Sequence, residues 1–361
     1  MHPLVSILIP AFNSQQWIAD TLRSAVAQTY PRKEIIVVDD GSTDGTSGIA
    51  RRFESDLVRV ISQQNQGAAA ARNKAFSLCR GDYIQWLDAD DLLAPDKIAL
   101  QMEAVRGCQG KGTLFSSAWG QFMYRYYRAE FIPTGLWCNL SPLEWLLRKM
   151  GQNLYMQTAA WLTSRELTEA AGPWDTRLLV DDDGEYFCRV LLASDRVRFV
   201  PEAKVYYRRS GCSSLSYIGR SDRKAEAHWR SMQLHVGYLR SLDESQEVRD
   251  ACVRYLQSSL IHFHPERADI VQQAAEMANE LGGRLEVPRL SWKYSWARAM
   301  FGWSSAKRAG LFLPRIRWSL ERSWDRTLFH LENWRLVEDL GHGKSRANFS
   351  LTCPEDLGRK N

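Results

Sequence analysis

Residues 34–44 read EIIVVDDGSTD, a run of apolar, mostly β-branched residues that ends abruptly in two aspartates and a glycine. Fully apolar runs of this kind are typical of strands that are buried on both faces of a parallel sheet. Three similar runs lie at residues 5–10, 58–61 and 83–87. Segments with a helical spacing of apolar residues lie between them, at 17–28, 43–53 and 67–79. This alternation predicts an α/β fold, with a doubly wound, mostly parallel sheet.

The rest of the chain has a different pattern. Strands are expected at 114–117, 121–127 and 197–209, and helices at 142–150 and 185–193. After about residue 220 the chain consists mostly of helix formers, with helices expected at 225–242, 246–262 and 268–281. We therefore expect a catalytic domain over 1–220, with halves 1–94 and 95–220, and a helical, Trp- and Arg-rich region over 221–361.

The composition excludes several classes of protein. With 361 residues, 45% of them hydrophobic and 25% charged, the chain is neither disordered nor fibrous. No apolar run approaches the roughly 18 to 20 residues of a membrane-spanning helix, and the start lacks the features of a signal peptide. Seven cysteines without a CxxC pair favour reduced thiols. We therefore expect a cytoplasmic protein.

Polar residues follow three of the predicted strands, where open α/β sheets bind their ligands. They form the segments Pro10–Asn13, Asp39–Asp44 and Asp88–Asp91. No GxGxxG or GxxxxGK[ST] motif accompanies them. Each acidic cluster is compatible with a simple turn or helix cap. Three carboxylates within four residues, however, repel one another unless a cation such as Mg²⁺ or Mn²⁺ joins them.

Five motifs in this order resemble the family 2 glycosyltransferases, which are inverting enzymes with the GT-A fold. The motifs are VSILIPAFN, IIVVDDGSTDGT, NQGAAAARNKA, GDYIQWLDADD and APDKI, and the resemblance covers about residues 4–216. It implies a nucleotide-diphospho-sugar donor, with a UDP-sugar favoured, and a divalent metal. It also implies a glycan or lipid-linked acceptor, in cell-envelope or exopolysaccharide biosynthesis.

The resemblance also assigns roles to residues. Pro10, Ala11 and Asn13 would line the nucleoside pocket, and Asp40 would accept a hydrogen bond from the base. Arg72 would lie near the base or the phosphates. Asp88-Ala89-Asp90 resembles the DxD motif, in which Asp88 would face the ribose or sugar and Asp90 would hold the metal.

The catalytic base of the family belongs to an acidic pair that opens a helix, and Asp182-Asp183-Gly184-Glu185 resembles it. In that pair the second acid is the base, so the resemblance implies Asp183, with Asp182 as the second candidate because residues 181–183 are a run of three aspartates. Such a base is needed to take the proton of the attacking hydroxyl. A solvated acidic cap favoured by the helix dipole is the alternative.

Two features stay open. Many relatives carry a phosphate-side histidine after the last strand, whereas this chain has Arg208 and Arg209, either of which could neutralise phosphate. Trp161 and Trp174 fall on the acceptor side, where they stack on a sugar or belong to the core.

Residues 287–326 contain nine basic and two acidic residues, which gives +7, together with five tryptophans. This pattern suggests a peripheral contact with the inner face of the cytoplasmic membrane. Packing on the catalytic domain is the alternative, and no recognition motif supports a nucleic-acid partner.

The sequence thus predicts a metal-dependent inverting glycosyltransferase. The alternatives are a nucleotidyltransferase and a catalytically inactive sugar-nucleotide binding module.

Overall fold

A computed structural model describes residues 2–108, 111–210, 221–288, 300, 303, 307 and 316–332. The chain forms two compact units. The first comprises Met1–Trp119 with Phe131–Pro288, and the second comprises Gly120–Glu130 with Arg289–Asn361. Among the helices within the described residues, none is long and apolar enough to cross a membrane.

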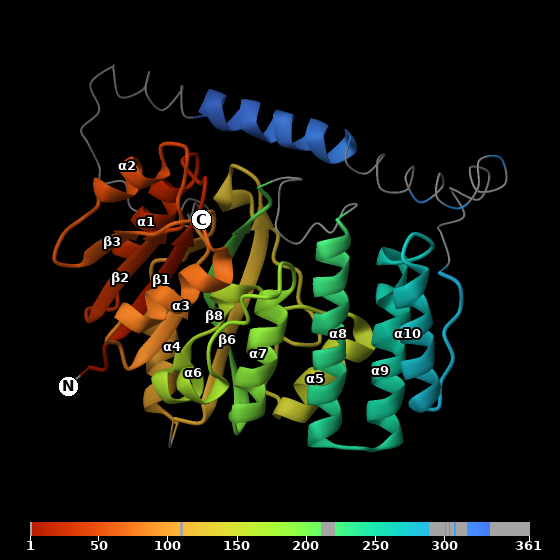
Figure 1. The fold of residues 1–361 in the computed structure, drawn as a ribbon. Coiled ribbons are helices and arrows are strands. Elements are labelled where there is room, and N and C mark those ends of the chain that lie inside the picture. Colours follow the sequence, from red (N-terminus) through yellow and green to blue (C-terminus); the bar gives the residue numbers. More distant parts are fainter. Residues whose placement is uncertain are drawn as a thin grey trace, which may run out of the picture. The chain divides into compact units, whose positions relative to one another are not determined.

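The first unit is built on a five-stranded sheet with the order β3-β2-β1-β4-β7 (Figure 1). Its strands are β1 (Val5–Ala11), β2 (Lys33–Asp39), β3 (Val58–Ser62), β4 (Tyr83–Trp86) and β7 (Thr163–Ser164). The first four are mutually parallel and β7 is antiparallel to β4. The helices that connect them are α1 (Ile18–Val26), α2 (Thr46–Arg51) and α3 (Ala68–Leu78). The predicted doubly wound sheet is confirmed, with helix bounds a few residues shorter than the sequence indicates.

A second, three-stranded sheet has the order β5-β8-β6. Its strands are β5 (Leu92–Leu93), β6 (Thr113–Phe122) and β8 (Arg196–Arg208). The sequence predicted two strands at 114–117 and 121–127, and this is wrong, because β6 runs without a break and a 3-10 turn follows at Tyr126–Arg128. Polar Ser117 does not interrupt the buried strand, since its hydroxyl donates a hydrogen bond to the Ala160 carbonyl (3.0 Å).

The remaining helices of this unit are α4 (Lys97–Arg106), α5 (Pro142–Gln152), α6 (Arg165–Ala171), α7 (Asp182–Ala193), α8 (Asp222–Leu242), α9 (Gln246–Ser259) and α10 (Ala268–Glu280). Five of them were predicted, whereas α4 and α6 were not. Helix α8 packs on α7 and helix α9 packs on α5. Buried side chains from Val5 to Leu281 form one continuous core. The helices after residue 220 therefore share a core with the sheet. The packing shows no boundary at residue 220, and the predicted division into domains at that residue stays a prediction.

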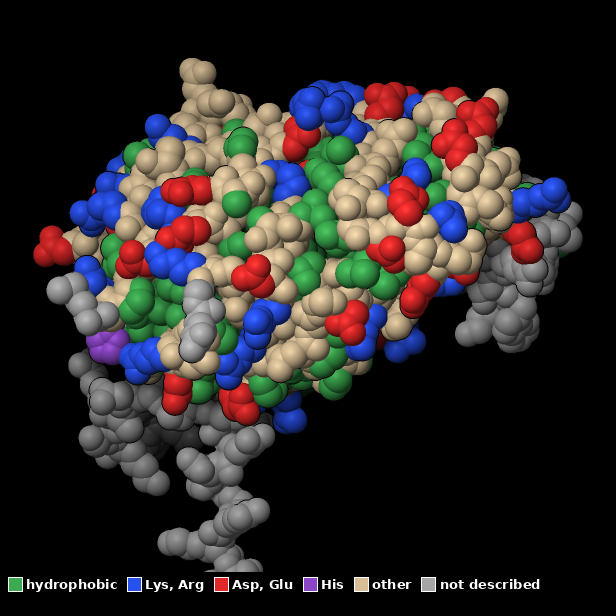
Figure 2. Space-filling view, turned by 90° about the horizontal axis from the view of Figure 1, so that it is seen from below, with side chains coloured by type: hydrophobic (Ala, Val, Ile, Leu, Met, Phe, Trp, Pro, Cys, Tyr) green, Lys and Arg blue, Asp and Glu red, His purple; other side chains and the backbone are tan. Residues whose placement is uncertain are grey.

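On the face shown in Figure 2, basic and acidic side chains of the described residues are interspersed. The five cysteines in the described part of the chain are free thiols, as the sequence predicted.

In the second unit, residues 316–332 form a helix. Arg125 pairs with Asp325 (2.7 Å) and with Glu332 (2.9 Å), and the ring of Tyr124 contacts that of Phe329. One face of this helix is therefore covered by residues 124–127 of its own unit.

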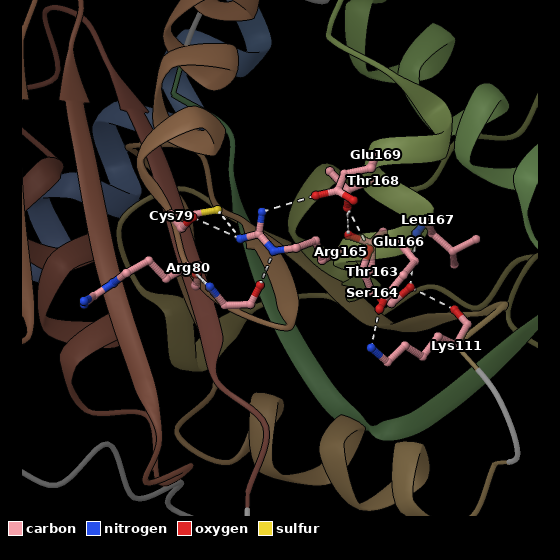
Figure 3. Close-up of polar contacts among 12 residues, drawn as sticks. Cys79, Arg80, Lys111, Thr163, Ser164, Arg165, Glu166, Leu167, Thr168 and Glu169 are labelled. Atoms are coloured by element: carbon pink, nitrogen blue, oxygen red, sulfur yellow. Dashed lines mark hydrogen bonds and ion pairs between the residues drawn. The ribbon is translucent and has the colours of Figure 1, made fainter.

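A cluster around Arg165 joins the start of α6 to the turn before β4 (Figure 3). The Arg165 guanidinium donates hydrogen bonds to the carbonyls of Gly81 (2.8 Å) and Cys79 (3.0 Å), and it lies 5.2 Å from the Phe76 ring centroid. One planar group thus satisfies two carbonyls that strand pairing does not reach.

We expect Arg165→Met to lower the free energy of unfolding by about 2–4 kcal/mol, because two carbonyl acceptors lose a charged donor. Urea denaturation measures this loss. The matched control is Arg80→Ala, since the Arg80 side chain is 78% exposed and lies 3.4 Å from Glu34. Such exposed pairs contribute about 0–1 kcal/mol. Equal losses in both variants would contradict the importance of the Arg165 cluster.

Candidate functional site

The carboxyl ends of β1, β2 and β4 meet at one edge of the sheet. In register, Ala11 lies beside Asp39, and the backbone N–H of Asp40 donates to the Ala11 carbonyl (2.8 Å). The Leu87 N–H donates to the Leu8 carbonyl (3.0 Å), which brings the segment after β4 to the same edge. Three of the polar segments that the sequence singled out therefore converge, as expected for a ligand site in a doubly wound sheet.

Asn13 joins the loop after β1 to the loop after β2. Its side-chain oxygen accepts a hydrogen bond from the Thr43 N–H (2.9 Å), and its own N–H donates to the Ser42 hydroxyl (2.9 Å). Its backbone is left-handed, with φ 46°, which asparagine tolerates better than most residues. Pro10 and Ala11 are buried beside it. Their predicted contact with a nucleoside stays a prediction.

Asp40 is buried, with 2% of its surface exposed, and it organises the loop that leads into α3. One carboxylate oxygen accepts from the Gln63 side chain (2.8 Å) and the Gln66 N–H (2.9 Å), and the other accepts from the Gly67 N–H (2.8 Å). Of the roughly four lone pairs of a carboxylate, one remains for another donor. The predicted hydrogen bond to a base would have to use that position.

Arg72 connects the acidic segment after β4 to the acidic start of α7. Its guanidinium is 2.8 Å from Asp88 and 2.7 Å from Asp182, and it lies 4.3 Å from the Trp174 ring centroid. Burial would lower the pKa of Arg72, but the carboxylates of Asp182 and Asp88 raise it. The guanidinium is therefore a fixed cation between two carboxylates that lie far apart in the sequence.

Asp91, the residue after the DxD segment, fixes that segment to the protein interior through hydrogen bonds of its carboxylate. It is fully buried, and its carboxylate accepts hydrogen bonds from the Gln157 side chain and from the Arg208 N–H (2.7 Å). The Arg208 side chain donates to the Asp90 carbonyl (2.7 Å) and is 3% exposed. Arg208 thus holds the backbone of this segment, while Arg209 is exposed.

Asp88 and Asp90 supply hard oxygen donors that suit Mg²⁺ or Mn²⁺. Burial and the nearby Asp88 charge raise the pKa of Asp90 to about 6. No group of three or more His, Cys, Asp or Glu side chains suited to a metal is found among the described residues. Two carboxylates fit a cation whose remaining ligands are water and substrate phosphate, which is how Mg²⁺ is usually held.

The acidic start of α7 places Asp182 and Asp183 in different surroundings. Asp182 pairs with Arg72, whereas Asp183 forms no ion pair within the described part of the chain. The Asp183 carboxylate accepts hydrogen bonds from the Thr158 hydroxyl (3.1 Å) and the Gly184 N–H (2.9 Å). Burial, then the charges of Asp182 and Asp181, raise the pKa of Asp183 to about 6. A carboxylate that titrates there suits a general base at neutral pH.

The sequence analysis missed two residues at this site. The Gln157 side chain donates a hydrogen bond to Asp91, and the Thr158 hydroxyl donates one to Asp183. No sequence motif surrounds them, because only the folded chain brings them to these carboxylates. Trp161 and Trp174 are 1% and 2% exposed, so both belong to the core and neither offers a face to a sugar.

The sequence and the structure of this chain were compared with those of known proteins, and the matches include glycosyltransferases. The family described as Glycosyl transferase family 2 matches residues 6–125. The putative teichuronic acid biosynthesis glycosyltransferase TuaG of Bacillus subtilis is 40% identical over 119 residues, which cover 32% of this chain and 47% of that protein. The chondroitin synthase of Escherichia coli is 45% identical over 106 residues, 29% of this chain and 16% of that protein. The chain thus matches less than half the length of these curated relatives.

Among solved structures, S. aureus TarS 1–349 in complex with UDP-GlcNAc has a TM-score of 0.64 at 16% identity. The match covers 77% of this chain and 81% of that one. The same protein in complex with UDP matches 97% of this chain and 94% of that one, with a TM-score of 0.57 at 16% identity. At these identities the likeness concerns the fold, which is of the GT-A type. Together with the motif-bearing edge of the sheet, these matches show that residues 6–125 are similar to the family 2 glycosyltransferases, within a fold of the GT-A type.

Proposed function

We propose that this chain transfers a sugar from a nucleotide-diphospho-sugar to an acceptor hydroxyl, with inversion at the anomeric carbon. The observation that carries the proposal is the difference between Asp182 and Asp183. Arg72 neutralises the first, while the second keeps a carboxylate whose only described donors are a hydroxyl and an amide. Arg72 also reaches Asp88, so the base and the DxD segment belong to one connected group of side chains.

In the proposed reaction the Asp183 carboxylate accepts the proton of the acceptor hydroxyl as its oxygen attacks the anomeric carbon. The bond from that carbon to the phosphate oxygen breaks, and its electron pair leaves with the nucleoside diphosphate. Asp90 would hold the divalent cation, with Asp88 facing the ribose or the sugar. A bound Mn²⁺ or Mg²⁺ stabilises the negative charge of the leaving diphosphate.

Pro10, Ala11, Asn13 and Asp40 would bind the nucleoside. A UDP-sugar is the favoured donor, since TarS was solved with UDP and with UDP-GlcNAc. The names of the two relatives, TuaG and the chondroitin synthase, refer to teichuronic acid biosynthesis and to chondroitin synthesis. We therefore place the reaction in cell-envelope or exopolysaccharide biosynthesis, with a glycan or lipid-linked acceptor on the cytoplasmic side.

We also propose a peripheral membrane contact for the helix at residues 316–332. Four large apolar side chains lie about one or two turns apart along it and are exposed, namely Ile316 (43%), Leu320 (67%), Trp324 (66%) and Leu331 (50%). The face used against residues 124–127 carries other residues, including Asp325 and Glu332. Three of the four apolar side chains lie within residues 287–326, which carry +7, whereas residues 316–332 themselves contain three arginines and three acidic residues. A basic segment with an exposed apolar stripe suits the surface of an anionic membrane. Much of that segment lies outside the described residues.

Asp183→Asn is expected to lower kcat by about 10²-fold or more, because the amide keeps the shape but accepts no proton. Donor affinity should change little. In the parent protein, kcat/KM should rise with pH through about 6, since the base works only when deprotonated. Release of nucleoside diphosphate, followed over pH 4.5–8.5, measures both quantities.

The matched variant is Asp182→Asn, which removes the partner of Arg72 and should mainly reduce stability. If Asp182→Asn is inactive while Asp183→Asn retains turnover, the base is Asp182.

Asp90→Ala is expected to abolish the Mn²⁺-dependent part of donor binding, because it removes a carboxylate ligand. Calorimetry with UDP-, GDP- and dTDP-sugars, with and without Mn²⁺, measures the effect and identifies the donor. Asp96→Ala, at the end of a nearby surface turn, is the control. Unchanged affinity of Asp90→Ala in Mn²⁺ would refute the metal assignment, and the absence of binding to every donor would refute the function.

Flotation with anionic liposomes tests the membrane contact. The protein should float at low salt and less so at high salt, since salt screens exposed charges. Leu320→Ser with Trp324→Ser should weaken flotation while sparing donor binding. The control is Val287→Ser, which changes an exposed apolar side chain outside the helix. A parent protein that stays with the soluble fraction at low salt would show that this stripe has another partner.

A further inference from the structure

A buried polar cluster lies behind the acidic start of α7, on the helices that follow residue 220. Its members come from four elements: Lys149 of α5, Asp181 before α7, Ser231 and His235 of α8, and Tyr255 of α9. Except for Asp181, these residues are 8% exposed or less. We call these five residues the α8–α9 cluster. It lies outside residues 6–125, which match the family.

One hydrogen bond of the cluster ends on the Asp181 carboxylate, and a second orients the histidine beside it. The Ser231 hydroxyl donates to Asp181 Oδ2 (2.5 Å), and His235 Nδ1 lies 3.7 Å from the same oxygen. His235 Nδ1 also shares a hydrogen bond with the Tyr255 hydroxyl (2.7 Å). Lys149 Nζ lies 5.7 Å from the centroid of the Tyr255 ring. Helix α8 therefore contacts the Asp181 side chain directly, and Tyr255 of α9 holds the His235 ring beside it.

Asp181 has a left-handed backbone, with φ 55° and ψ 28°. This conformation costs most non-glycine residues about 1–2 kcal/mol, and aspartate adopts it more readily because its short side chain can form a local hydrogen bond. An aspartate before a helix usually caps that helix with its own side chain. Asp181 makes no such bond and turns to α8 instead. A Cβ atom at Gly184 would collide with Asp181 Oδ1, so the carboxylate packs directly against the first turn of α7.

The surroundings of the cluster also determine the protonation states of Asp181 and His235. Burial would raise the pKa of Asp181, but His235, Lys149, His228 and the Ser231 hydroxyl lower it, so the group is anionic. Burial and then Lys149 lower the pKa of His235 to about 3, so its ring is neutral at pH 7.

We propose that Ser231, His235 and Tyr255 are positioning residues for the reaction, which hold Asp181 in its left-handed conformation and thereby fix Asp183 against Thr158. The inference rests on the proposed function, since it assigns these residues a task for the base Asp183. They act through Asp181 and touch no substrate. The helices after residue 220 then contribute to catalysis through the placement of one carboxylate.

A kinetic comparison tests this with hydrolysis of UDP-GlcNAc, in which water replaces the acceptor and UDP release is followed. Ser231→Ala and His235→Leu should lower kcat about 10-fold or more and leave KM for UDP-GlcNAc within twofold. His235→Asn should restore part of kcat, because its amide places a hydrogen-bonding atom near the position of Nδ1. The control is Cys252→Ala, which alters the buried face of α9 and should leave kcat unchanged.

The pH profile gives a second readout, because Asp181 also acts on Asp183 through its charge. The charged groups that face Asp183 are Asp181 and Asp182 on its own segment, Arg72 of α3, and Asp88 after β4. Asp181→Asn removes one negative charge, so the acid limb of kcat/KM should move to lower pH. A merely structural loss would lower the rate without moving the limb.

The outcomes are distinct. Equal kcat losses in His235→Leu and Cys252→Ala, or an acid limb unmoved by Asp181→Asn, would overturn the inference and leave the proposed function standing. If the folded parent protein turns over none of the UDP-, GDP- or dTDP-sugars, the proposed function fails and the inference falls with it. Lower kcat at constant KM, with rescue by asparagine and a shifted acid limb, supports it.

Discussion

The site depends on one buried cation. Arg72 places a single guanidinium between Asp88 and Asp182, and the ring of Trp174 covers it. Without that charge, four carboxylates from two segments would face one another in a poorly solvated space, at a cost of several kcal/mol for each unpaired buried ion. The positive charge therefore permits an acidic site to exist, and it also determines which carboxylate of the pair on α7 is neutralised.

The surrounding structure makes this arrangement rigid. Asp91 and Arg208 fix the segment after β4 to the second sheet, and Thr21 of α1 donates a hydrogen bond to the Ala89 carbonyl (2.9 Å). Each of these bonds joins parts of the chain that are far apart in sequence. Rigid support of this kind is what holds reacting groups in a productive geometry. Arg208 takes part in this support through the Asp90 carbonyl and the Asp91 carboxylate.

The sequence predicted the sheet well because β1 to β4 are local, apolar and regularly spaced. The meeting of the segments after β1, β2 and β4 at one edge of the sheet followed from their places at strand ends, while the roles of Asp40, Asp88 and Asp183 stay predictions. What the sequence did not indicate depends on tertiary packing. Strand β6 continues through Ser117 because the Ser117 hydroxyl donates a hydrogen bond to the Ala160 carbonyl, a partner 43 residues away that the local sequence does not indicate. Thr158 and Asp181 gained their roles from α7 and α8, and neither carries a pattern of its own. The burial of Trp161 and Trp174 could only be decided by the packing around them.

The strained backbone at Asp181 has a consequence for folding. The first turn of α7 needs a left-handed residue that is stabilised from α8 and α9, so this turn has little reason to form alone. Ser231 lies 50 residues beyond Asp181, and Asp182 lies 110 residues beyond Arg72. During synthesis, the half of the chain that carries the nucleotide motifs can fold long before these partners emerge. The ability to bind a nucleotide would then precede the ability to use it, and the last helices to dock would complete the enzyme.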